Sequence, residues 1–264
     1  MASNGEGVKT LRPLGWWGSL VLFGVPAAMF AAGIYGAMPW LIERGWHSYY
    51  AYNAALGLPM VLMVVAALVA VRLEERRLDW STLCARLRLR PMTGRAWLLA
   101  LGSLVLCSGL GFSLVNALMG QVLQAGWLRT PEELPTFFDP MARVTVVAAY
   151  DLALGGIQGN WWAVGFTVGM LALNVVAEEF WWRGVILPRQ ELVWGRSTWA
   201  IHGVLWAVFH AYKWWSVPGL IPIALGLAWV CQREESTTPG LLIHLVTNGV
   251  GLIPLVAGVM GLLG

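Results

Sequence analysis

Long apolar runs, separated by short polar segments, make up most of this 264-residue chain. Residues 13–42 and residues 97–128 contain no Asp, Glu, Lys or Arg. Because a helix needs about 20 apolar residues to cross a bilayer, each long run predicts a membrane-spanning α-helix. The predicted spans are residues 16–41, 49–71, 96–120, 161–187, 198–213, 216–231 and 239–263. The pattern therefore predicts an all-α, polytopic transmembrane bundle of about seven helices.

One further apolar segment, residues 141–158, is interrupted by Asp151 and by the pair Gly155 and Gly156. It would form an eighth span, a re-entrant piece or a helix at the membrane interface. We favour a piece that does not cross the membrane, because seven crossings then put most Lys and Arg residues on one side.

Positive charge is concentrated in the segment 72–95, which carries seven arginines. Arg-rich loops stay in the cytoplasm, so this loop and the N-terminus are predicted to be cytoplasmic and the C-terminus to lie outside. This topology suits a multi-pass protein of a plasma or inner membrane. The net charge of +3 is therefore explained by the arginines that orient the chain in a lipid bilayer. It does not predict a nucleic-acid partner.

Hydrophobic residues make up 58% of the chain and charged residues 12%. Soluble domains carry about 25% charged residues, so this composition leaves no room for a separate soluble domain. We expect a single integral-membrane domain, 1–264. Within it, residues 1–95 would form an N-terminal two-helix extension that includes the basic loop 72–95.

Ionisable residues interrupt the apolar run 171–187, which contains Glu178, Glu179 and Arg183. A charge in mid-membrane costs roughly 2.5–3.5 kcal/mol on insertion scales, so such groups tend to face a partner or a functional cavity. Glu179 and Arg183 are four residues apart, which an ion pair within the helix explains. Glu178 points about 100° away from Glu179 and has no charged partner in its helix, so it is the candidate general base.

Later apolar runs add His210 and the pair His244 and Asn248. His244 and Asn248 lie about one turn apart, so both side chains project from one helix face. Their hydrogen-bond donors suit either the stabilisation of an oxyanion or hydrogen bonds between membrane helices.

A divalent metal such as zinc would need Glu178, His210 and His244 from three separate helices. The sequence has no HExxH motif, and its three cysteines lack ligand spacing. We therefore assign no metal ligands, and we expect either no cofactor or a metal held by those three side chains.

Three motifs occur in order, each on its own predicted helix: EExxxR at 178–183, an aromatic variant of FxxxH at 206–210, and HxxxN at 244–248. In this ordered set the chain resembles the CAAX protease and bacteriocin-processing family of intramembrane proteases, also called the ABI family. That family includes the type II CAAX prenyl endopeptidases. The resemblance covers about residues 95–260 and implies a protease-like core at 96–260.

The resemblance also implies a role for each motif residue. Glu178 would activate a water molecule together with His210. His244 and Asn248 would stabilise the tetrahedral oxyanion that forms when the peptide carbonyl is attacked.

Three further residues would support these groups. Glu179 and Arg183 would hold the motif helix and the first glutamate in place. Trp206 stands where the family motif has phenylalanine, and we interpret it as a packing substitution on the same helix face.

The expected function is an intramembrane endopeptidase that cleaves a membrane-associated protein or peptide, with a C-terminal CAAX-like tail as one substrate class of the family. Members have been called metalloproteases, whereas the Glu, His and Asn set favours a metal-independent glutamate protease. The alternatives are a proton-coupled transporter and a non-catalytic membrane partner or immunity protein. Arg183 and Arg189 mark the predicted cytoplasmic end of the motif helix, so the site is expected to open to the cytoplasmic leaflet.

Overall fold

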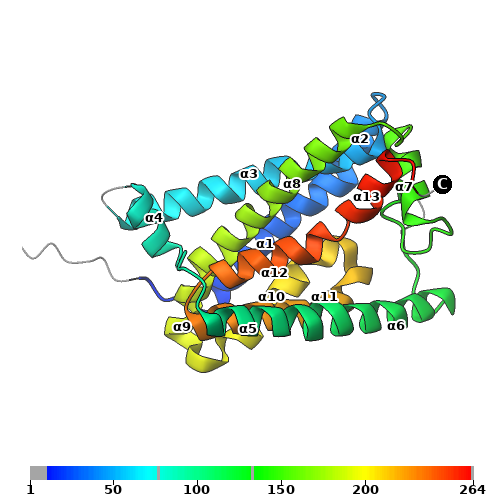
Figure 1. Ribbon diagram of the computed structural model, residues 1–264. Coiled ribbons are helices and arrows are strands. Elements are labelled where there is room, and N and C mark those ends of the chain that lie inside the picture. Colours follow the sequence, from blue (N-terminus) through cyan, green and yellow to red (C-terminus); the bar gives the residue numbers. More distant parts are fainter. Residues whose placement is uncertain (1–10, 76–77, 132–133, 263–264) are drawn as a thin grey trace, which may run out of the picture.

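Helices form all of the regular secondary structure in the part of the chain that the computed structural model describes, residues 11–75, 78–131 and 134–262 (Figure 1). This confirms the all-α prediction. In chain order the elements are α1 (Trp16–Ala32), η1 (Gly33–Ala37), α2 (Met38–Ile42), α3 (Ser48–Glu74), α4 (Trp80–Arg86), α5 (Gly94–Ser103), η2 (Leu104–Phe112), α6 (Ser113–Gln124), α7 (Val146–Leu154), α8 (Trp161–Glu179), η3 (Phe180–Ile186), α9 (Leu187–Trp194), η4 (Gly195–Ser197), α10 (Thr198–Phe209), η5 (His210–Ser216), α11 (Val217–Glu234), α12 (Thr238–Gly249) and α13 (Leu252–Val259).

The structure has fewer helices that are long and apolar enough to cross a membrane than the sequence pattern predicts. Four helical stretches of the described chain qualify as spans, or up to five if the bent pair α12 and α13 is one span. The count of about seven is therefore not confirmed. Helical turns run from Trp161 to Glu234 with a kink at Lys213, and this run counts once although α10 and α11 lie side by side within it. By itself α10 has 12 residues, fewer than the roughly 20 that a span needs.

The segment 141–158 contains only α7, whose nine residues cover about 14 Å. That length is less than half of the roughly 30 Å hydrocarbon core, which agrees with a piece that does not cross. Thr145 caps the helix by accepting a hydrogen bond from Ala148 N at 3.1 Å. Gly155 ends it in the left-handed conformation, with φ of +66°.

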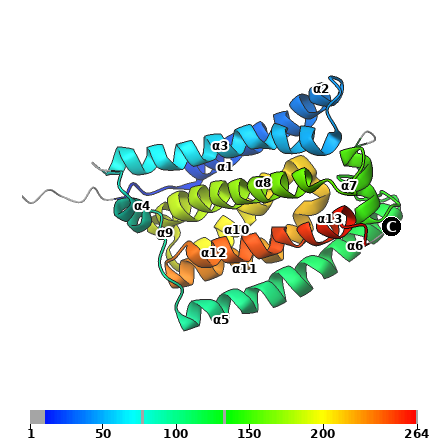
Figure 2. The same cartoon turned by 45° about the horizontal axis from the view of Figure 1, so that its top comes forward.

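The central helix of the bundle is α8, which packs against both α3 and α12 (Figures 1 and 2). Helices α5 and α6 with the wider turns of η2 run along one side, against α11. Apolar side chains of α1 and α3 share a buried core with Trp182, Trp206 and Phe209 from the second half of the chain. The N-terminal helices thus form one wall of the same bundle.

Directly after α8 the helix widens into the π-helical turns of η3, which begin at the residue after Glu179. Turns of this kind appear as bulges in α-helices and frequently occur at functional sites. The widened turns still leave Arg183 facing Glu179, and the two side chains form an ion pair at 3.0 Å. The local geometry therefore keeps the predicted pair together.

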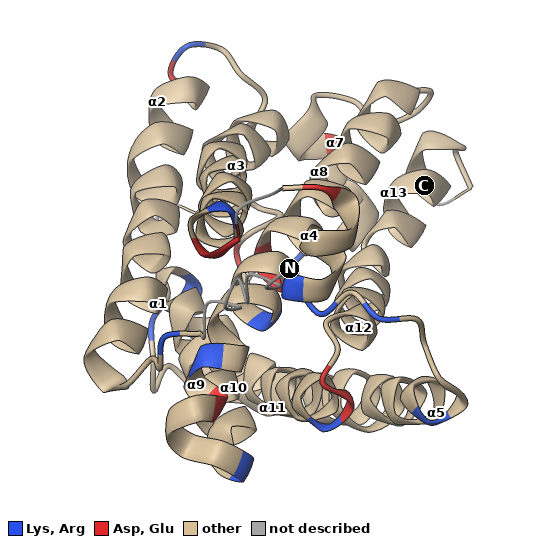
Figure 3. Cartoon of the chain, turned by 90° about the vertical axis from the view of Figure 1, so that its left-hand side faces the viewer, with Lys and Arg blue, Asp and Glu red and all other residues tan. Residues whose placement is uncertain are grey.

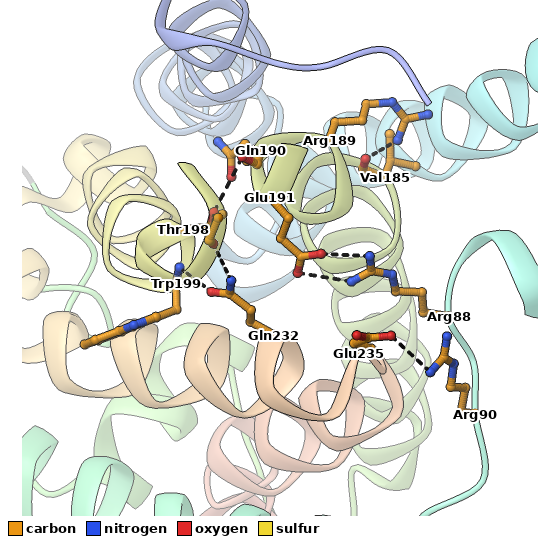
Figure 4. Close-up of polar contacts among 11 residues, drawn as sticks. Arg88, Arg90, Val185, Arg189, Gln190, Glu191, Thr198, Trp199, Gln232 and Glu235 are labelled. Carbon is orange, nitrogen blue, oxygen red and sulfur yellow. Dashed lines mark hydrogen bonds and ion pairs between the residues drawn. The ribbon is translucent and has the colours of Figure 1, made fainter. Parts of the chain in front are cut away.

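Charged residues gather at the end of the bundle that carries α4 and α9 (Figure 3). Arg88 makes two hydrogen bonds to Glu191, of 3.1 and 2.8 Å, and Arg90 pairs with Glu235 at 3.5 Å (Figure 4). Arg86 of the loop and Arg189 of α9 both pair with Glu74, the last residue of α3. The arginine-rich loop is thus tied to α9, to the end of α11 and to α3, and part of its charge is neutralised.

Candidate active site

A cavity of about 270 Å³ lies inside the bundle, between α3, α8, η5 and α12. The four predicted catalytic side chains all line it: Glu178, His210, His244 and Asn248. They come from three segments that are far apart in the sequence. The structure thus brings together the residues that the motifs single out.

Glu178 is 2% exposed, and hydrogen-bond donors hold both of its carboxylate oxygens. Asn174 Nδ2 donates to Oε1 at 2.8 Å, and Trp206 Nε1 donates to Oε2 at 2.8 Å. Two fixed donors stabilise the ionised form of a buried carboxylate and set its orientation. Glu178 is therefore aimed into the cavity by neighbours on two different helices.

Trp206 does more than fill space. Its indole N–H is one of the two donors to Glu178, and a phenylalanine at this position would have none. Its ring also faces Arg183, whose guanidinium carbon lies 4.5 Å from the ring centroid. The packing interpretation is therefore incomplete, because the tryptophan links the glutamate to the supporting arginine.

Glu179 sits behind the cavity and is fully buried. Its Oε1 accepts hydrogen bonds from Arg183 at 3.0 Å and from His244 Nδ1 at 2.9 Å. Gly240 of α12 makes room for the other oxygen, since a Cβ there would lie 2.5 Å from Glu179 Oε2. The supporting pair is thus more than an ion pair within one helix, because it also fixes the ring of His244.

His210 stands where α10 ends and η5 begins. Its Nδ1 is 2.9 Å from the carbonyl oxygen of Trp206, so we assign the proton to Nδ1 and leave Nε2 as an acceptor. Three residues later Lys213 leaves the helical conformation, with φ of −129° and ψ of 60°. This break turns the chain beside the cavity, which Lys213 also lines.

Asn248 belongs to α12 and is exposed toward the cavity side. Its Nδ2 donates to Asn174 Oδ1 at 2.9 Å, which leaves its second N–H for another acceptor. Asn174 thus bridges Asn248 and Glu178 across two helices. The motifs assign no role to Asn174, although a polar side chain four residues before Glu178 in an apolar run is a signal that points to it.

The alternative metal set is not assembled as a ligand group. The described residues contain no cluster of three His, Cys, Asp or Glu side chains placed to hold a metal ion. His210 and His244 each use Nδ1 on a protein acceptor. These bonds leave Nε2 of each ring, and histidines that ligate a metal also hold their other nitrogen on a carboxylate or a carbonyl oxygen. The choice between no cofactor and a divalent metal therefore stays a prediction.

The cavity extends away from the arginine-rich end. Its lining includes Tyr52 in the first turns of α3 and Gly251 after α12, whereas Arg189 pairs with the last residue of α3. Along α3, Tyr52 and Glu74 are about 33 Å apart at 1.5 Å per residue. The lining therefore reaches along the first half of α3, away from Glu74. The expectation that the site opens toward Arg183 and Arg189 stays a prediction.

Comparison with known proteins agrees with the motifs. Residues 160–250 match a family model described as type II CAAX prenyl endopeptidase Rce1-like. No curated protein and no solved structure matches the chain. The matched segment contains every residue that the motifs assign to the site, from Glu178 to Asn248.

Proposed function

We propose that this membrane protein is an intramembrane endopeptidase, because residues 160–250 match the model of the Rce1-like family of type II CAAX prenyl endopeptidases. The single observation that carries the proposal is the cavity in which Glu178, His210, His244 and Asn248 meet. Peptide hydrolysis needs a general base, an oriented water molecule and donors for the oxyanion. This set offers Glu178, His210 and the pair His244 and Asn248 for these three tasks.

Glu178 acts first as the base. Its carboxylate takes a proton from a water molecule, and the water oxygen attacks the peptide carbonyl carbon to form a tetrahedral intermediate. The proton then passes from Glu178 to the leaving nitrogen as the carbon–nitrogen bond breaks. The products are a new carboxyl group and a new amine, and Glu178 returns to its starting state.

His210 orients the water. With its proton on Nδ1 and the bond to Trp206 O, the ring presents Nε2 as an acceptor for one water hydrogen. The carboxylate of Glu178 takes the other hydrogen. Two acceptors from separate helices define the position of the water better than one would.

His244 and Asn248 serve the oxyanion. Glu179 holds His244 through Nδ1, so a protonated ring donates from Nε2 into the cavity, stabilised by the carboxylate behind it. Asn248 offers the N–H that Asn174 does not use. Donors fixed before the reaction stabilise the developing charge without reorganising.

The substrate would be a membrane-associated protein or peptide, because the cavity lies within an apolar bundle. A C-terminal CAAX-like tail is a substrate class that the family suggests. For the topology we propose seven crossings with a cytoplasmic N-terminus, supported by the charged end in Figure 3. In that orientation the substrate segment approaches from the end opposite the arginine-rich loop.

The test compares protein termini in the host. A deletion strain is complemented at matched expression with the wild type, with Glu178→Gln or with Glu191→Gln, a control that changes a carboxylate outside the cavity. Mass spectrometry of membrane and secreted proteins then identifies new termini. We expect termini that require the wild type or Glu191→Gln and are missing with Glu178→Gln. If both glutamate variants restore the wild-type pattern, the chain acts as a non-catalytic partner instead.

A further inference from the structure

A second cavity, of about 400 Å³, lies beside the candidate active site. It is formed by the start of α3, the loop before α7, and α7 itself. Tyr52, Asn53 and Tyr150 line both cavities. The second cavity, which we call the vestibule, therefore adjoins the active-site cavity at these three side chains.

Aromatic side chains dominate the vestibule. Five rings line it: Tyr49, Tyr52, Phe137, Phe138 and Tyr150. Neighbouring rings meet edge to face, with centroids 5.2 to 5.9 Å apart in the Tyr52–Phe137, Tyr49–Tyr150 and Tyr49–Phe137 pairs. Hydrogen bonds hold two of the hydroxyls, from Tyr49 to Thr167 at 2.6 Å and from Tyr150 to Gly251 O at 3.3 Å. The lining is thus fixed in place.

One carboxylate completes the lining. Asp139 Oδ1 accepts a hydrogen bond from Met141 N at 2.8 Å, and Oδ2 makes no hydrogen bond or ion pair with any described residue. No Lys, Arg or His is among the described residues that line the vestibule. Arg143 is close in sequence, but it is exposed and lines a different cavity.

We propose that the vestibule binds a cationic side chain of the substrate, a Lys or Arg on the segment that flanks the cleaved bond. This inference rests on the proposed function. Aromatic rings attract an ammonium or guanidinium group through their faces, and a carboxylate adds a charge-assisted hydrogen bond. Lys213 lines the active-site cavity and not the vestibule, so its charge disfavours a cation at the scissile bond and favours one in the vestibule.

The experiment uses the full chain in vesicles of phosphatidylethanolamine and phosphatidylglycerol. The probe is a library of peptides, each with one apolar membrane-spanning segment and a flank beside it. The flank is randomised, with lysine and norleucine among the residues at its positions. Mass spectrometry identifies the cleaved members. We compare the wild type with Asp139→Asn, which keeps the acceptor for Met141 N, and with Asp151→Asn, a control that removes a carboxylate on the same end outside the vestibule.

For the wild type and Asp151→Asn we expect Lys or Arg to be enriched about tenfold over norleucine at a fixed distance from the cut, since 1.4 kcal/mol of contact corresponds to tenfold. Asp139→Asn should lose this enrichment while it still cuts neutral members. No enrichment with the wild type, or the same enrichment with Asp139→Asn, would overturn the inference.

A binding arm separates this inference from the proposed function. Glu178→Gln should cut nothing, and the uncut peptides that purify with it report binding alone. If Glu178→Gln cuts, the proposed mechanism fails, and the captured peptides still test the vestibule.

Phosphatidylcholine vesicles supply a competing quaternary ammonium group. A preference for lysine that vanishes in them would assign the vestibule to lipid headgroups and overturn the substrate role.

Discussion

Charged side chains cluster in two regions of this molecule, and their surroundings differ. Inside the bundle, Glu179 and Arg183 have side chains that are 0% exposed, and His244 is 5% exposed. At the arginine-rich end, Arg90 and Glu235 are 55% and 66% exposed. Water screens the outer pair, so it contributes little to stability, whereas the inner groups depend on one another. The candidate site therefore uses the buried charges, whose removal from water costs more free energy than that of the exposed ones.

The largest effect should follow from breaking the inner cluster. Arg183→Met leaves Glu179 buried with His244 as its partner. Removal of one member of a buried ion pair typically costs about 3–5 kcal/mol in the free energy of unfolding. Unfolding of the purified protein in detergent measures this loss. Equal stability of Arg183→Met and the wild type would contradict the importance assigned to burial.

A smaller loss is expected from Gly240→Ala. The added methyl group would meet Glu179 Oε2 at 2.5 Å and Cys231 Sγ at 2.8 Å. Overpacking of a well-filled interior costs about 1–3 kcal/mol. Gly165→Ala in α8 is the matched control, because a Cβ there meets no atom within 4 Å. If both variants unfold alike in the same detergent assay, the space around Glu179 is not as tight as described.

Trp206→Phe restores the residue of the family motif and should still impair this protein. It removes the donor to Glu178 Oε2, and a buried acceptor without a partner costs about 1–3 kcal/mol. We expect the cleavage rate to fall about two- to tenfold if roughly half of that cost reaches the transition state. Trp182→Phe is the control, since Trp182 is fully buried but its Nε1 donates to no described residue. A loss of cleavage as large with Trp182→Phe would show that only volume matters.

The smallest effect should come from the outer pair. Arg90→Gln removes one half-exposed charge at 3.5 Å from Glu235. We expect a change in unfolding free energy of about 0–1 kcal/mol, and no change in cleavage. A loss comparable to that of Arg183→Met would remove the contrast between the two regions.

Much of the site could be predicted from the sequence because its chemistry is concentrated in short motifs. Spacing of four residues identified the Glu179 and Arg183 pair, and the absence of a charged partner singled out Glu178. The bond between Asn174 and Asn248 could not be predicted, because it depends on which helices are neighbours. Likewise, the aromatic ring of Trp206 suggested a packing role. Only its position next to Glu178 reveals that its indole N–H donates a hydrogen bond to the carboxylate.

The number and direction of the membrane helices were harder to predict. Apolar runs identify helices, but they do not say where helical turns continue through a reversal of the chain, as they do between Trp161 and Glu234. The extent of the cavity was hard to predict for a related reason. Arginines mark one end of the motif helix, whereas the width of the cavity depends on side chains from α3 and α7.

The most direct test of the central claim is hydrolysis in water labelled with the heavy oxygen isotope. Purified wild type and Glu178→Gln, both shown to be folded, are incubated in this water with a peptide that the wild type cleaves. Mass spectrometry then follows the new C-terminus. We expect one heavy oxygen in the new carboxyl group with the wild type and no product with Glu178→Gln. Equal labelled product from both proteins would contradict it.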